Sequence, residues 1–151
     1  MARILAVGSA KWSDHRRTVA ALRKVMTIYR GPYTLVCDMG DGAPRHAAAA
    51  ARQLGWTVEA HELDAAKCAK DCPPQHRRAG GPTGDWCPTA AGRNRNTMLD
   101  SGIDVVLSFI RPGRRDDQGT RVGQAETRRR GIGIWTIEQP WKDNGRGNQT
   151  E

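Results

Sequence analysis

Short apolar runs, each ended by turn-forming residues, recur along the chain. In chain order they are Ile4–Val7, Thr34–Cys37, Thr57–Ala60, Val105–Phe109 and Ile132–Ile137. None of them alternates cleanly between polar and apolar residues. Continuous apolar runs of this length are typical of parallel strands that are covered on both faces. The pattern therefore predicts five buried strands.

Between these runs, apolar residues recur at helical spacing. Ser13 or Asp14 can cap a first helix, and the residues that share one face of this helix are Val19, Leu22, Val25 and Met26. Three further helices are predicted at Ala43–Leu54, Asn94–Asp100 and Thr120–Arg130. Strands that alternate with helices predict an α/β fold, Rossmann-like and doubly wound, with a mainly parallel sheet of about five strands. We expect one domain over residues 1–141.

Two segments fall outside this alternation. Residues 64–92 are rich in Cys, Pro, Gly and Arg and show no helical or strand period. This segment is too long for an ordinary connection, which predicts a Cys/His-rich insert that something must organise. Residues 142–151 are polar and glycine-rich, and we expect a disordered tail there.

The charge balance favours anionic partners. The 151 residues include 24 Lys and Arg against 16 Asp and Glu, a formal net charge of +8. Nucleotides, nucleic acid or an acidic surface fit such a balance, and an arginine-rich surface that merely aids solubility explains it equally well. No apolar run approaches the roughly 18 residues of a membrane span, and the first apolar run is too short for a signal peptide. We expect a cytoplasmic protein whose cysteines are reduced.

Glycine-containing turns follow the first, second and fourth predicted strands. In a parallel sheet, ligands bind outside the carboxyl ends of the strands. Glycine lets backbone approach a ligand closely, and helix N-termini attract phosphate. The turns therefore predict a cradle for a phosphate-bearing anion. The predicted ligand residues are Gly8, Ser9, Lys11, Trp12, Gly40, Gly42, Ala43, Arg93, Asn94, Gly119 and Thr120.

Three of these side chains admit two interpretations each. Arg93 offers a planar fork of donors that fits phosphate, or it forms an ordinary salt bridge. Asn94 bonds a sugar or base, or it caps the helix that follows. Trp12 stacks on a base, or it belongs to the core.

Four short motifs carry a family resemblance. They are Gly8-Ser9-x-Lys11-Trp12, Gly40-x-Gly42-Ala43, Arg93-Asn94-x-x-x-Met98, and Gly119-Thr120 followed by Gly131-Ile132. With these motifs the chain resembles the SLOG superfamily, named for the DNA-processing Smf proteins and the Lonely Guy enzymes. It looks most like the small YspA-like members, which are frequent in bacteria and phages. The resemblance implies a Rossmann-like fold and a nucleotide-derived ligand.

The chain also departs from the family pattern. Lonely Guy enzymes carry a catalytic glutamate three residues after the threonine of their Gly-Thr turn, and that position here is Gly123. YspA-like sequences usually have an aspartate where this chain has Pro44. The remaining carboxylates near the predicted cradle, and hence the candidate catalytic residues, are Asp38, Asp41 and Glu126.

Three functions follow from these observations. The leading hypothesis is a domain that binds or senses a nucleotide derivative. The alternative is a phosphoribohydrolase-type N-glycosidic hydrolase, which needs a carboxylate at the cradle. The third is nucleic-acid binding, as in the Smf branch, which the basic segments 111–115 and 128–130 favour. The sequence leaves the ligand, the reaction and the oligomeric state open, a homo-oligomer included.

Four metal-ligating residues occur in the insert. Cys68, Cys72, His76 and Cys87 form the pattern C-x3-C-x3-H-x10-C. Thiolates and imidazole are the usual ligands of tetrahedral structural zinc, and a long loop with little core gains most from such an ion. Unrelated thiols or a disulfide are the alternatives. We expect a structural zinc site.

Overall fold

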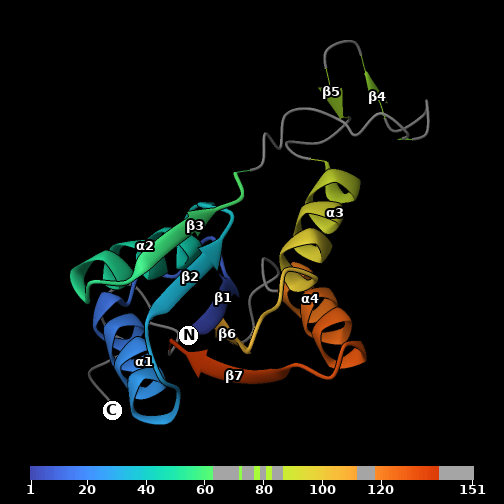
Figure 1. The fold of residues 1–151 in the computed structure, drawn as a ribbon. Coiled ribbons are helices and arrows are strands. Elements are labelled where there is room, and N and C mark those ends of the chain that lie inside the picture. Colours follow the sequence, from blue (N-terminus) through green and yellow to red (C-terminus); the bar gives the residue numbers. More distant parts are fainter. Residues whose placement is uncertain (63–71, 73–76, 79–80, 83–86, 112–117, 140–151) are drawn as a thin grey trace.

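A five-stranded sheet, all parallel, forms the centre of the computed structural model, in the order β3-β2-β1-β6-β7 (Figure 1). Its strands are β1 (Ala2–Gly8), β2 (Tyr33–Cys37), β3 (Thr57–Ala60), β6 (Val105–Ile110) and β7 (Gly133–Glu138). The structure describes residues 1–62, 72, 77–78, 81–82, 87–111 and 118–139. All five predicted strands are confirmed.

Helices cover both faces of the sheet. On one face lie α1 (His15–Ile28) and α2 (Ala43–Gln53), and on the other lie α3 (Pro88–Leu99) and α4 (Gln118–Arg129) (Figure 1). The predicted Rossmann-like, doubly wound α/β fold is therefore confirmed. None of the helices in the described ranges is long and apolar enough to cross a membrane.

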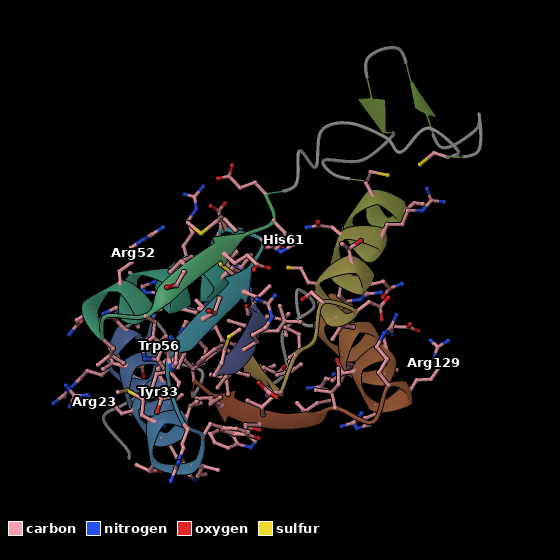
Figure 2. All side chains as sticks on the ribbon, in the orientation of Figure 1. Arg23, Tyr33, Arg52, Trp56, His61 and Arg129 are labelled. Atoms are coloured by element: carbon pink, nitrogen blue, oxygen red, sulfur yellow. The ribbon has the colours of Figure 1, made fainter. Side chains whose placement is uncertain are left out.

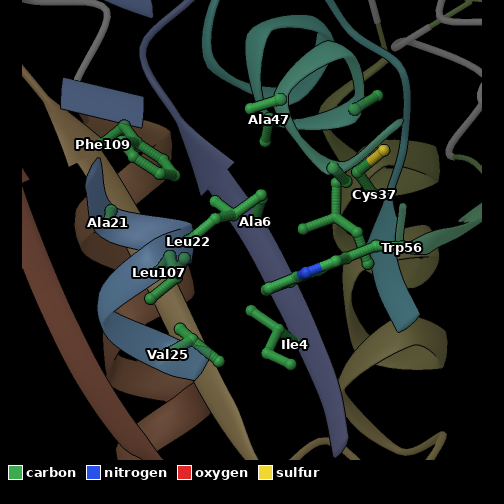
Figure 3. Close-up of a cluster of buried hydrophobic side chains, with 14 of the residues drawn as sticks. Ile4, Ala6, Ala21, Leu22, Val25, Cys37, Ala47, Trp56, Leu107 and Phe109 are labelled. Carbon is green, nitrogen blue, oxygen red and sulfur yellow. The ribbon is translucent and has the colours of Figure 1, made fainter. Parts of the chain in front are cut away.

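Successive side chains of β1 pack against the two helical layers in turn. Ile4 and Ala6 pack into a cluster with the apolar residues of α1 and α2 (Figure 3), while Leu5 packs with Met98 and Leu99 of α3. Successive side chains of a strand point to opposite faces, so a strand buried on both faces is apolar throughout. The poly-alanine stretch of α2 allows this helix to lie close against the sheet.

The chain order creates one topological switch point. From β1 the chain adds β2 and then β3 on one side, and it later returns to place β6 and β7 on the other side. The switch point therefore lies between β1 and β6. In open α/β sheets, ligands bind outside the carboxyl ends of the strands at such a point.

The start of α3 was predicted wrongly. The helix begins at Pro88, six residues before the predicted Asn94. The Cys87 sulfur accepts a hydrogen bond from the backbone N–H of Ala90 at 3.3 Å, and proline is well suited to the first helical position. Asn94 consequently lies inside the helix and does not cap it.

The insert also contains regular structure that its composition does not predict. The two-residue strands β4 (Arg77–Arg78) and β5 (Gly81–Pro82) pair antiparallel. Most of the predicted insert and the predicted tail at 142–151 lie outside the described residues.

One position of the first helix was also assigned wrongly. Met26 is 40% exposed, although it was expected to share the buried face. The buried stripe is Thr18, Ala21, Leu22 and Val25. Thr18 takes a place in this stripe because its hydroxyl accepts from Trp12 Nε1 and donates to the Asp14 carbonyl. Asp14 is the N-cap, as one of the two predicted options had it.

Candidate functional site

The loop after β1 packs directly on the end of β6. The Ser9 N–H donates to the Phe109 carbonyl at 2.9 Å. A Cβ atom at Gly8 would overlap this same carbonyl group. Gly8 is therefore required for the close approach of the two strands that border the switch point.

The second glycine turn touches the first. The Ser9 carbonyl accepts hydrogen bonds from the N–H groups of Trp12 and Ala43. A Cβ atom at Gly42, whose φ is +75°, would overlap the backbone of Ser9 and Ala10. The turns after β1 and β2 thus converge, and their glycines allow contact between two backbone segments.

The first turn of α2 has few donors left for a ligand. The Ala43 N–H is bonded to the Ser9 carbonyl, Pro44 has no N–H, and the Arg45 N–H donates to the Gly40 carbonyl at 3.2 Å. In this conformation Gly40, Gly42 and Ala43 shape the loop. The predicted donors to phosphate must come from another part of the edge.

Trp12 belongs to the core. Its ring is 2% exposed and meets the ring of Phe109 edge to face, with centroids 5.2 Å apart. Its Nε1 donates to the Thr18 hydroxyl at 2.8 Å. No face of the indole is open to a base in this structure.

Two basic residues meet at the switch point. Lys11, in the loop after β1, is exposed, and Arg111 directly follows β6. The Arg111 Nη1 atom donates to the Lys11 carbonyl at 3.2 Å. Arg111 was not among the predicted ligand residues, although its segment was recognised as basic. Its place as the first residue after a buried strand was the signal that could have identified it.

The last predicted cradle residues begin α4. Gly119 and Thr120 lie in the first turn of this helix, which starts after the carboxyl end of β6. The N–H groups of a first turn have no partner inside the helix and attract anions. The first turn of α4 is therefore the candidate source of backbone donors that the first turn of α2 does not offer.

The arginine–asparagine motif lies on α3. Arg93 is exposed. The Asn94 Nδ2 atom donates to the His61 carbonyl at 2.8 Å, and so it ties α3 to the end of β3. Figure 2 places His61 at this end of β3.

Comparison with known proteins found a family model that matches the first part of the chain. Residues 2–67 match the model of the YspA, cpYpsA-related SLOG family. The predicted SLOG resemblance is confirmed. Among solved structures, DNA processing protein A (DprA) from Streptococcus pneumoniae is similar, with 15% identity and a TM-score of 0.48 over 89% of this chain. The chain covers 58% of that protein. No curated protein matches the sequence.

Gly123, which the resemblance aligns with the Lonely Guy glutamate, is covered by a side chain of α3. A Cβ atom at Gly123 would lie 3.1 Å from Cδ of Arg95, so the stem of this α3 arginine covers the glycine. Burial, with a smaller contribution from Arg130, lowers the pKa of the Arg95 guanidinium. The stem of a guanidinium side chain thus lies beside Gly123.

The candidate catalytic carboxylates are held in local interactions. Asp38 accepts from the Gly40 N–H at 2.8 Å, and the exposed Asp41 pairs with Arg45 at 3.4 Å. Glu126 pairs with both Arg129 and Arg130. It lies six residues after Thr120, about 9 Å further along the helix axis. Each of the three carboxylates is thus engaged by a neighbouring donor or cation.

A charged network joins β1 to β3, on the side of β1 that is away from β6. Arg3 donates to both carboxylate oxygens of Glu59 at 2.9 Å, and His61 Nε2 lies 2.7 Å from the same carboxylate. The hydrogen bond from Arg3 and then the one from His61 lower the pKa of Glu59 to about 2. Sequence reasoning missed this network, because it joins strands that are far apart in the chain.

Two of the four predicted metal ligands are described. The sulfur atoms of Cys72 and Cys87 lie 3.5 Å apart, and both residues are buried. Cys68 and His76 lie outside the described residues. Within the described ranges, no three His, Cys, Asp or Glu residues cluster closely enough to hold a metal ion.

A shallow hollow of about 460 Å³ opens beside the same sheet edge, at the start of α1. It is lined by Ser13, Asp14, His15, Arg16 and Gln139. None of the predicted ligand residues lines it, and the acidic N-cap Asp14 faces it. The switch point, with its two cations, is the better candidate for binding an anion.

Proposed function

We propose that this SLOG-like domain binds a phosphate-bearing nucleotide derivative at the switch point between β1 and β6. The observation that carries the proposal is the contact between Arg111 and the Lys11 carbonyl. It places the Arg111 guanidinium against the backbone of Lys11, another basic residue, where open α/β sheets bind ligands. A planar guanidinium fits phosphate oxygens with two parallel hydrogen bonds.

The start of α4 supports the same site. Gly119 and Thr120 lie in the first turn of α4, and the N–H groups of a helix N-terminus would attract the phosphate. The SLOG resemblance implies a nucleotide-derived ligand for this Gly-Thr turn. Arg93 and Asn94 remain the proposed partners of the rest of the ligand, with Asn94 released from His61 or bonding through its oxygen.

Affinity measurements on a nucleotide panel test the proposal. The four common nucleoside monophosphates are titrated into the protein by calorimetry, beside the Arg111→Ala and Lys11→Ala variants. A charge-assisted hydrogen bond contributes about 1.5–3 kcal/mol, so each variant should weaken binding by about one to two powers of ten. Arg52→Ala, an exposed arginine on α2, is the matched control and should bind as the unmodified protein does.

The alternative, a phosphoribohydrolase, is less well supported. Hydrolysis needs a group that activates water or protonates the leaving base. Gly123 supplies none, and Glu126 is paired with two arginines. We expect bound nucleoside monophosphates to release little free base. Rapid release that is abolished by Glu126→Gln or Asp41→Asn would show that the domain is an enzyme.

Nucleic-acid binding is the second candidate, and one observation favours it. Helices α1 and α2 contain six Lys or Arg residues and no Asp or Glu. Figure 2 shows Arg23 and Arg52 pointing outward from this layer. Oligonucleotide binding through this face should weaken steeply with salt and fall in an Arg23→Ala/Arg52→Ala double variant. Arg111→Ala should leave such binding unchanged if the two sites are separate.

A further inference from the structure

Two buried cysteines meet where the insert joins α3. Cys87 is the N-cap of α3, and Cys72 comes from the insert, fifteen residues earlier in the chain. Their sulfur atoms are 3.5 Å apart. A disulfide bond is about 2.0 Å long, so the two sulfurs are neighbours without being bonded to each other.

This separation is close to that of two thiolates on one tetrahedral metal ion. With Zn–S bonds of about 2.3 Å and tetrahedral angles, two sulfur ligands lie about 3.8 Å apart. The Ala90 N–H donates to the Cys87 sulfur at 3.3 Å. Hydrogen bonds of this kind orient the groups that ligate a metal ion.

The nucleotide-binding proposal makes no use of these cysteines. We propose that Cys72 and Cys87 are two ligands of a structural zinc ion that ties the insert to the N-terminus of α3. A closed structural site has four protein ligands. The spacing C-x3-C-x3-H-x10-C offers Cys68 and His76 for the other two, and both lie outside the described residues.

A zinc ion bound to Cys72 and Cys87 would stabilise a defined part of the fold. Asn94 and Arg95 lie on α3 about two turns after Cys87. Asn94 holds this helix to β3 through one hydrogen bond. A zinc ion at Cys87 would fix the start of α3 and, with it, the side of the domain that carries the arginine–asparagine motif.

Metal analysis of the full chain tests the proposal. The protein is produced with zinc in the medium and purified without chelator, and its metal content is measured by mass spectrometry. We expect about one zinc ion per chain, and Cys72→Ser and Cys87→Ser should each lose most of it. Cys37→Ala is the matched control, since Cys37 is buried in β2 away from the pair, and it should retain the ion.

Cobalt substitution provides a readout that does not depend on the variants folding. Cobalt in the unmodified chain should show intense thiolate-to-metal charge transfer and the visible bands of a tetrahedral site. Unmodified protein without zinc, octahedral cobalt spectra, or a Cys72–Cys87 disulfide under reducing conditions would overturn the proposal. Full zinc retention in both Cys68→Ser and His76→Ala would overturn the closed four-ligand site.

Discussion

At the residue scale, contact between two backbone segments explains why residue 42 is a glycine. Its φ of +75° is unfavourable for other residues, and a Cβ atom there would overlap the backbone of Ser9 and Ala10. The contact holds the turns after β1 and β2 together at the carboxyl edge. Glycine is therefore needed at this position whether or not a ligand binds.

Replacement of Gly42 by Ala should destabilise the protein by at least about 2 kcal/mol, because left-handed strain and backbone overlap add. Gly55→Ala is the matched control, since Gly55 has a φ of +80° and nothing within 4 Å of its Cβ position. Strain alone should cost about 1–2 kcal/mol there. Denaturant unfolding gives both values, and equal losses would contradict the overlap.

A second prediction concerns Glu59 and pH. Its pKa is lowered to about 2 from an ordinary 4.5. A carboxylate with a lowered pKa stabilises the fold above its unfolded-state pKa, and this stability is lost as the pH falls from about 4.5 to about 2. The pair with Arg3 is partly exposed, so we expect Glu59→Gln to cost about 1 kcal/mol at pH 7.

The cost of Glu59→Gln should shrink when unfolding is measured at pH 3. Glu62→Gln removes an exposed carboxylate from the same segment. Among the described residues, Glu62 forms no ion pair. That control should change stability little at either pH. A cost of Glu59→Gln that is the same at pH 7 and pH 3 would contradict the predicted linkage.

At the element scale, α3 is the part that sequence reasoning placed least well. The strands and the other helices were predictable because continuous apolar runs and capped, amphipathic stretches depend on local sequence. The first turn of α3 depends instead on Cys87 as N-cap and on Pro88, residue types that suggested a loop. The pairing of β4 and β5 likewise involves too few residues to leave a pattern.

The link between α3 and β3 can be tested at Asn94. Asn94→Asp replaces the amide donor with a carboxylate, which cannot donate to the His61 carbonyl. Loss of this hydrogen bond with repulsion between oxygens should cost about 1–3 kcal/mol. Faster amide hydrogen exchange in α3 should accompany it. Thr97→Ala, at an exposed position of the same helix, should leave the exchange unchanged.

At the scale of the whole molecule, the order of the strands creates the candidate site. Lys11 and Arg111 are 100 residues apart and meet only because the chain returns to place β6 beside β1. Local sequence contains the glycine turns but not this adjacency. For the same reason Trp12 was open to two interpretations, since its partners Thr18 and Phe109 are known only once α1 and β6 are in place.

The distribution of charge separates the two binding functions in space. The switch point has Lys11 and Arg111, whereas α1 and α2 present their arginines on the outer surface of one helical layer. A small nucleotide and a long nucleic acid would therefore perturb different residues. A method that reads each backbone amide can tell them apart.

The most direct test is an NMR titration of the ¹⁵N-labelled protein with nucleoside monophosphates, following every assigned backbone amide. A nucleotide site between β1 and β6 should give saturable shifts concentrated at residues 8–12, at Arg111 and at Gly119 and Thr120, and these shifts should be lost in the Arg111→Ala variant. Shifts confined to the outer faces of α1 and α2, or no saturable shifts in a folded protein, would contradict a nucleotide site between β1 and β6.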